Sequence, residues 1–124
     1  MTIRTTDIST LELLPNKVVR HTYKDGSVVD LDEAQRVVGI IEEMIGQGNT
    51  KVILNDLRAK VAFSREARDF FKNNGDHTTV MAFLINSKIG EVTVNFYLKF
   101  NQPDYQMRIF TDEQEAMQWL EKHC

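Results

Sequence analysis

The segments VILNDLR (residues 52–58) and VMAFLI (residues 80–85) decide the fold of this chain. The second is apolar throughout, and the first opens with three apolar residues. A short unbroken apolar run is typical of a strand that is buried on both faces, as in a parallel sheet between layers of helices. We therefore expect an α/β domain, and the segment YQMRIF (residues 105–110) predicts a third strand.

Two short apolar clusters precede these strands and flank the dipeptide Pro15-Asn16. Because proline and asparagine favour turns, we expect a hairpin with strands near residues 8–14 and 17–23. The hairpin and the three later strands predict a mixed sheet of about five strands. Residues 1–7 are polar, and we expect them to be frayed.

Helix signals occur in three places. Asp30 can cap the first helix, whose apolar residues recur at steps of three and four. Ser64 can cap a second helix over residues 65–73. Thr111, with Gln114 three residues later, predicts a capping box for the last helix. The inner face of the last helix is expected to contain Ala116, Trp119 and Leu120.

Residues 91–100 fit two secondary structures. Every second residue in this segment is apolar, which is typical of a strand. Ile89, Val92 and Phe96 also share one helical stripe. The strands on either side, if they are parallel neighbours, need a crossover, which is usually a helix. The pattern alone leaves strand and helix equally open.

Composition limits the class of protein. The 124 residues are 42% hydrophobic and 27% charged, which favours a single globular domain over residues 1–124. Fifteen basic residues against 18 acidic ones give a net charge of −3. The chain therefore has no excess of positive charge to neutralise nucleic-acid phosphates, and we expect no nucleic-acid partner.

Cysteine and histidine usage adds two expectations. Cys124 is the only cysteine, so it can form neither an internal disulfide nor a cysteine zinc site, which favours a cytoplasmic location. His21, His77 and His123 lack metal-ligand spacing, and we expect them at the surface with no metal or cofactor. We also expect no signal peptide and no transmembrane segment, because no apolar stretch is long enough.

Polar residues follow the two buried strands and form the candidate ligand pocket. Asp56 and Arg58 end the first strand, and Asn86 and Ser87 end the second. Open α/β sheets bind ligands at the carboxyl ends of their strands. Capping of free backbone groups is the alternative role for these four residues. The acids at the helix starts are expected to be solvated and to complement the helix dipole; they are Asp32, Glu33, Asp112 and Glu113.

Three motifs carry a family resemblance: the strand VILNDLR, which ends in an Asp-Leu step; the segments NFYL (residues 95–98) and NQP (residues 101–103); and the ending RIFTDE (residues 108–113), followed by Trp119-Leu120. Together they resemble small uncharacterised bacterial proteins of the SpoIIAA-like (STAS) superfamily. The resemblance extends over residues 8–122. It implies a SpoIIAA-like fold with about four helices, one of them over residues 88–100.

The resemblance also bears on function. In the anti-sigma-factor antagonists of this fold, a phosphorylatable serine follows an aspartate at the start of the helix after the Asp-Leu strand. Counted from Asp56, these two positions hold Ser64 and Arg65. The phosphorylation switch is therefore expected to be absent, and the resemblance implies a non-enzymatic protein-interaction or regulatory domain. The alternative is a small-molecule or lipid binder related to the CRAL-TRIO proteins.

A helix over residues 88–100 would carry more apolar residues than one face can bury. Val94, Leu98 and part of Tyr97 would then point away from the sheet. Exposed apolar patches usually mark a partner surface, so we predict an interface here with a protein partner or a second copy of the chain. Coverage by neighbouring helices, or a strand in place of the helix, would remove this surplus.

Overall fold

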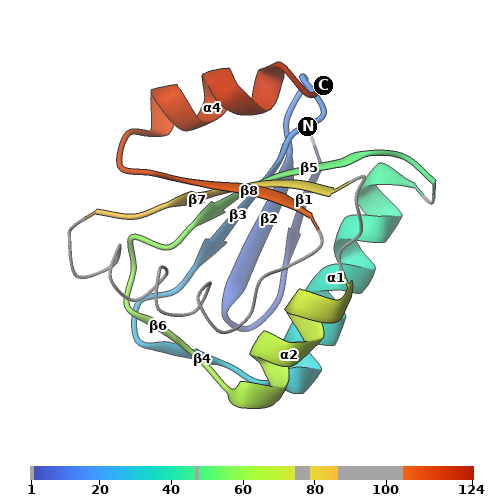
Figure 1. Cartoon of the computed structure of the whole chain (residues 1–124). Coiled ribbons are helices and arrows are strands. Elements are labelled where there is room, and N and C mark those ends of the chain that lie inside the picture. Colours follow the sequence, from blue (N-terminus) through green and yellow to red (C-terminus); the bar gives the residue numbers. More distant parts are fainter. Residues whose placement is uncertain (1, 47, 75–78, 87–104) are drawn as a thin grey trace.

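The structure, a computed structural model, describes residues 2–46, 48–74, 79–86 and 105–124. Six strands form one sheet in the order β1-β2-β3-β5-β7-β8, and two form a separate small sheet, β4-β6 (Figure 1). The strands are β1 (Thr2–Thr5), β2 (Ser9–Leu13), β3 (Val19–Tyr23), β4 (Ser27–Val29), β5 (Lys51–Asp56), β6 (Val61–Phe63), β7 (Thr79–Leu84) and β8 (Gln106–Phe110). The helices within the described residues are α1 (Leu31–Ile45), α2 (Arg65–Asn74) and α4 (Glu113–Glu121).

The large sheet is mixed, as the sequence predicts. β2 and β3 form the expected antiparallel hairpin, with Ser9 opposite Tyr23 and Leu13 opposite Val19. β3, β5, β7 and β8 are parallel neighbours, which confirms the buried parallel centre. The sheet has one strand more than expected. The helix expected over residues 88–100 lies outside the described residues.

The extra strand is β1, and it corrects the expectation of a frayed start. Residues Thr2–Thr5 pair antiparallel with β2, from Thr2 opposite Leu13 to Thr5 opposite Thr10. Threonine and isoleucine favour the extended backbone, and β2 offers a free edge for their main-chain groups. Polarity alone was therefore a poor guide to order here, because an edge strand does not need to bury its side chains.

Helices cover both faces of the sheet. α4 lies on one face, with α1 and α2 on the opposite side (Figure 1). α4 docks through Ala116 and Leu120, which are fully buried, and Trp119 packs against the same core, as predicted. α1 packs on the other face through Val37, Ile40 and Ile41. Among the described residues, no helix is long and apolar enough to cross a membrane.

Two of the three predicted helix caps are confirmed. Asp30 Oδ1 accepts a hydrogen bond from the backbone N–H of Glu33 at 2.9 Å, and Ser64 Oγ accepts one from Ala67 at 3.1 Å. The last helix is capped by Asp112 instead of Thr111. Its carboxylate accepts from two backbone N–H groups, and its negative charge, which a threonine hydroxyl lacks, complements the helix dipole.

Candidate functional site

The carboxyl ends of β5 and β7 bring three of the four predicted pocket residues together. Asp56 is the last residue of β5 and is only 8% exposed. Arg58 follows it, and Asn86 follows β7 and donates from Nδ2 to the backbone oxygen of Arg58 at 3.1 Å. Ser87 lies outside the described residues. This hydrogen bond to a free carbonyl supports the capping role for Asn86.

Asp56 is held by two arginines. Its Oδ1 accepts from the backbone N–H and Nε of Arg58 at 3.1 and 2.9 Å, and its Oδ2 accepts from Nη2 of Arg58 at 2.7 Å. Arg20 Nη2 donates to the same Oδ2 at 3.0 Å. Both arginines also donate to Oε1 of Glu113, Arg20 at 2.8 Å and Arg58 at 3.1 Å. The four side chains form one ion-pair network at the edge of the sheet.

Two residues of the network, Arg20 and Glu113, were not predicted to belong to the site. Arg20 pairs in register with Leu54, so it lies on the α4 face of the sheet, beside β5. A basic residue within a strand next to a buried acid was a usable signal, but only if the pairing of β3 with β5 is known. Glu113 was expected to be solvated, and its side chain is 41% exposed, but its carboxylate also joins the first turn of α4 to this network.

The electrostatics of the network favour the ionised form of Asp56. Burial disfavours the charged carboxylate, but the hydrogen bonds and charge of Arg58, with the charge of Arg20, outweigh this and lower the pKa of Asp56. Asp56 in turn raises the pKa of Arg58 through their hydrogen bond. A general acid or base works best with a pKa near the operating pH. Asp56 is therefore suited to anchoring neighbouring elements and poorly suited to proton transfer.

His21 was expected at the surface, but it lies in the core. It is 1% exposed, and its Nε2 lies 3.0 Å from Ser9 Oγ. Burial lowers the pKa of His21 to about 4, although a hydrogen bond with Asn55 raises it in part. The alternation of β3 explains the error, because Val19 faces the core and residues two apart in a strand share a face.

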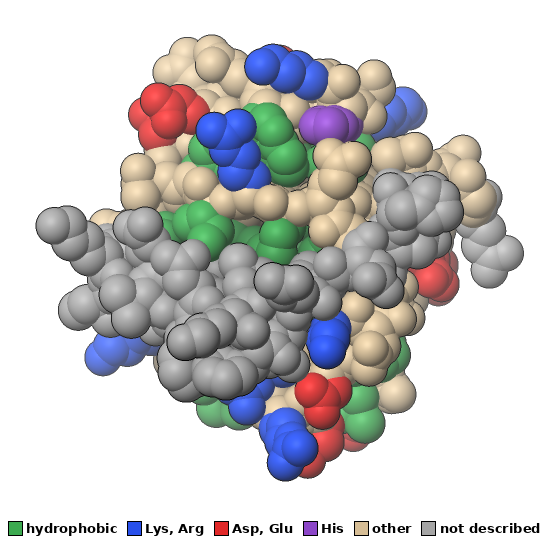
Figure 2. All heavy atoms as spheres, in the orientation of Figure 1, with side chains coloured by type: hydrophobic (Ala, Val, Ile, Leu, Met, Phe, Trp, Pro, Cys, Tyr) green, Lys and Arg blue, Asp and Glu red, His purple; other side chains and the backbone are tan. Residues whose placement is uncertain are grey.

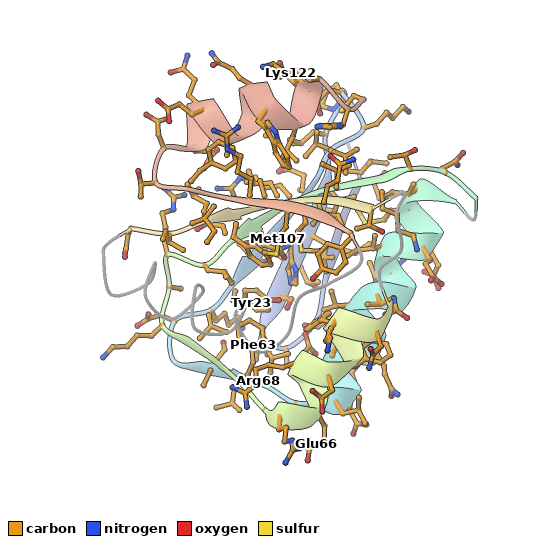
Figure 3. All side chains as sticks on the ribbon, viewed as in Figure 1. Tyr23, Phe63, Glu66, Arg68, Met107 and Lys122 are labelled. Carbon is orange, nitrogen blue, oxygen red and sulfur yellow. The ribbon has the colours of Figure 1, made fainter. Side chains whose placement is uncertain are left out.

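A second buried acid lies in the first turn of α1. Glu33 is only 5% exposed, which contradicts the expectation of a solvated helix start. Thr6 Oγ1 donates a hydrogen bond to its Oε2, and Arg36 forms an ion pair with its Oε1 at 3.2 Å. Burial and the nearby charge of Glu33 raise the pKa of Tyr23. Tyr23 and Phe63 lie next to each other (Figure 3), with ring centroids 5.8 Å apart, so this region is an aromatic core with satisfied polar groups.

The structure has a hollow of about 430 Å³ away from Asp56, at the other end of β5. It lies between the carboxyl ends of α1 and α4 and the end of β2. The residues that line it include Leu13, Lys17, Met44, Asn49, Val52 and His123. Of the predicted pocket residues that the structure describes, Asp56, Arg58 and Asn86, none lines this hollow. Ligand binding at these three residues and Ser87 stays a prediction.

Other expectations concern metals, surface charge and the predicted interface. Within the described residues, no group of three or more His, Cys, Asp or Glu side chains could hold a metal ion. Figure 2 shows acidic, basic and apolar side chains intermixed on the described part of one face. The predicted interface residues Val94, Tyr97 and Leu98 lie outside the described residues, so that interface stays a prediction.

The order of strands and the two helical layers define the class, an α/β domain of the SpoIIAA-like fold. A search of solved structures supports this class with an uncharacterized protein from the DUF3478 family with a SpoIIAA-like fold from Shewanella loihica PV-4. The two chains share 12% sequence identity and superpose with a TM-score of 0.63, over 96% of this chain and 90% of the other. At this identity, the likeness shows the fold alone.

The sequence comparison then gives the family. Residues 12–124 match the family described as domain of unknown function (DUF7793), and the chain belongs to that family. No curated protein matches the chain.

Proposed function

We propose that this chain is a non-enzymatic protein-interaction domain with a regulatory role, and that it pairs with a second copy of itself through the free edge of β1. The observation that carries the proposal is the exposure of β1. All four of its residues are exposed, and Ile3 is 57% exposed at the outer edge of the large sheet. An edge strand offers unpaired N–H and C=O groups to another strand.

Within the part of the chain that the structure describes, the β1 edge lacks the usual protection against such pairing. Proteins commonly block an edge strand with proline, lysine, a bulge or a covering segment. Residues Thr2–Thr5 contain neither proline nor lysine, and they pair with β2 in continuous register. The one charge, on Arg4, is drawn toward α1 by an ion pair with Glu43 at 2.7 Å. The outer edge is therefore uncharged in the plane of the sheet.

A twofold antiparallel pair of β1 strands fits this edge when it is centred on Ile3. Ile3 pairs with Glu12 on one face, and Arg4 pairs with Leu11 on the other. In the centred register the two Ile3 side chains lie opposite each other on one face, and each Thr2 lies opposite the other copy's Arg4. This arrangement covers the exposed isoleucines and avoids a pair of like charges. Because four-residue strands bury little area, the dimer is expected to be weak.

The absence of enzymatic activity in this proposal is supported by how the candidate chemical groups are used. Asp56 is fully occupied by arginines, and its pKa is lowered. His21 is enclosed in the core and hydrogen-bonded to Ser9. Neither group is both accessible and tuned for proton transfer. The cytoplasmic location expected from the cysteine content stays a prediction.

Sedimentation velocity on four proteins tests the proposal over concentrations from about 10 µM to about 1 mM, the range in which a weak dimer exchanges. Wild type should show a sedimentation coefficient that rises with concentration, and Ile3→Lys should remain monomeric. Val28→Lys is the matched control, because Val28 on β4 is 64% exposed and lies away from this edge. It should behave like wild type.

Leu98→Lys separates the two proposed surfaces. Loss of the dimer in Leu98→Lys but not in Ile3→Lys would move the interface to Val94, Tyr97 and Leu98 and reject the role of β1. A wild-type protein that stays monomeric over the whole range would reject self-association altogether.

One observation favours the alternative function, a small-molecule or lipid binder. The hollow at the end of β2 has a volume within the range of small-ligand sites. The hollow is independent of the β1 edge.

A further inference from the structure

We infer that the outer edge of β8 binds an extended segment of a partner protein, which adds a strand antiparallel to β8 and places an acidic side chain beside Arg108. Strand addition at a sheet edge is a common way of binding peptides. The inference rests on the proposed protein-interaction role but not on dimer formation through β1, because β8 is the opposite edge of the large sheet.

The main chain of β8 shows which groups the edge offers. The backbone oxygen of Phe110 accepts a hydrogen bond from the N–H of Ile85, directly after β7, at 2.9 Å, so Phe110 turns its main-chain groups toward β7. Successive residues of a strand turn these groups to alternate sides, so Met107 and Ile109 turn theirs outward. In the described sheet no further strand pairs with β8. The edge therefore offers the N–H and C=O groups of two residues to an extended backbone.

The β8 edge also lacks the features that commonly block pairing. Residues Gln106–Phe110 contain neither proline nor lysine, and their register with β7 is continuous. The guanidinium of Arg108 lies over the Phe110 ring, 5.3 Å from its centroid, so this side chain follows the strand on one face of the sheet. β8 crosses the front of the molecule in Figure 1, and Figure 2 shows apolar side chains on both sides of it.

Both faces of the sheet present apolar side chains beside this edge. Met107 pairs in register with Met81, which packs against the core under α1, so Met107 and Ile109 lie on the α1 face. Both are half-buried. On the α4 face, the partly buried Trp119 packs on Phe110, with ring centroids 5.8 Å apart. An added strand would direct alternate side chains over these two surfaces and bury more of each.

Arg108 favours an acidic residue in the added strand. It is exposed, and it pairs in register with Ala82, which lies in the core under α4, so its side chain is on the α4 face. None of the ion pairs between described residues includes Arg108. The two acids after β8 have other contacts, because Asp112 caps α4 and Glu113 belongs to the ion-pair network. A glutamate opposite Arg108 would form a favourable cross-strand pair.

The peptide TVEVT, acetylated and amidated at its ends, tests the inference. In the antiparallel arrangement its glutamate lies opposite Arg108, and its two valines lie opposite Met107 and Ile109 on the α1 face. NMR spectra of the ¹⁵N-labelled protein are recorded at about 50 µM with peptide up to about 5 mM, a range suited to a weak complex. The amide signals of residues 106–110 should shift in a saturable way, and those of residues 2–5 should stay fixed.

Methylated peptides test the main-chain pairing. In the antiparallel arrangement the two valine N–H groups donate to the C=O groups of Met107 and Ile109. A TVEVT peptide with both valine nitrogens methylated should therefore not bind. Methylation of the glutamate nitrogen, which points away from β8, should leave the affinity unchanged.

A charge exchange tests the role of Arg108. Arg108→Glu should bind TVEVT about tenfold more weakly than wild type, because an opposite-charge pair becomes a like-charge pair. It should bind the peptide TVKVT about as well as wild type binds TVEVT, which shows that the variant is folded. Arg65→Glu is the matched control, because its side chain on α2 is 83% exposed and lies outside β8. Ile3→Lys should also bind TVEVT like wild type, so a failure of the β1 dimer leaves this test intact.

Four results would overturn the inference. The first is the absence of saturable shifts at residues 106–110. The second is shifts at residues 2–5 in their place, which would assign the peptide to β1. The third is binding of the valine-methylated peptide. The fourth is equal affinity of Arg108→Glu and wild type for TVEVT.

Discussion

Arg20 on β3 and Glu113 in the first turn of α4 form an ion pair at 2.8 Å across 93 positions of sequence. The same Arg20 Nη2 also reaches Asp56 at the end of β5, at 3.0 Å. One guanidinium thus connects two parallel strands to the last helix. We infer that this network holds α4 on the sheet, so its contribution to the free energy of unfolding can be measured.

Asp56→Asn should lower the free energy of unfolding by about 2–3 kcal/mol. The variant leaves two arginines with only Glu113 as a counter-charge, in a partly buried setting. Asp69→Asn is the control, because Asp69 pairs with the exposed Arg65 at 4.0 Å and such pairs contribute little. Urea unfolding at neutral pH measures both. A similar loss of unfolding free energy in the two variants would contradict a role of the network in holding α4 on the sheet.

Stability should depend on the protonation of His21. Its pKa is about 4 in the folded protein against 6.5 for the unperturbed side chain, so the unfolded state takes up the proton first. The contribution of His21 is therefore fully present above pH 6.5 and is lost as the pH falls toward 4, by roughly 3 kcal/mol in total.

The difference between wild type and His21→Gln isolates this effect, because carboxylates also titrate in that range. Urea unfolding at several pH values should show a shallower decline in the variant between pH 6.5 and 4. Parallel curves for the two proteins would show that His21 does not titrate as its burial requires.

The docking of α4 should depend on its inner face. Leu120→Ala should cost about 3–5 kcal/mol, since Leu120 is fully buried in the core beside Ala116. Trp119→Ala should cost about 2–5 kcal/mol, because the indole packs on Phe110 with ring centroids 5.8 Å apart. Gln118→Ala, on the exposed face, is the control. An unchanged unfolding midpoint for Trp119→Ala would refute its part in docking.

Ser64 is predicted to cap α2 without acting as a phosphorylation switch. Ser64→Ala should cost about 1 kcal/mol, whereas Ser64→Asp should retain the stability, because aspartate caps as well as serine. Mass spectrometry of the protein from its native host should find Ser64 unmodified. Stoichiometric phosphate at Ser64 would refute the prediction.

Much of the architecture could be predicted because it depends on local patterns. The unbroken apolar runs at residues 52–54 and 80–85 became the central strands β5 and β7, and Asp30 and Ser64 cap helices as their side chains suggest. These features depend on neighbours in sequence, where periodicity and capping chemistry are visible.

The parts that were missed depend on long-range contacts. Arg20 joins the site only because β3 pairs with β5, and β1 is ordered only because β2 has a free edge. His21 is the exception, since the alternation of its own strand predicts an inward position once Val19 is placed in the core.

The most direct test of the account is a dilution series of ¹⁵N-labelled wild type, observed by NMR from about 1 mM to about 20 µM. The account predicts that the amide signals of residues 2–5 shift with concentration, that those of β4 stay fixed, and that Ile3→Lys abolishes the shifts. Signals of residues 2–5 that do not move, or shifts confined to residues 94–98, would contradict association through β1.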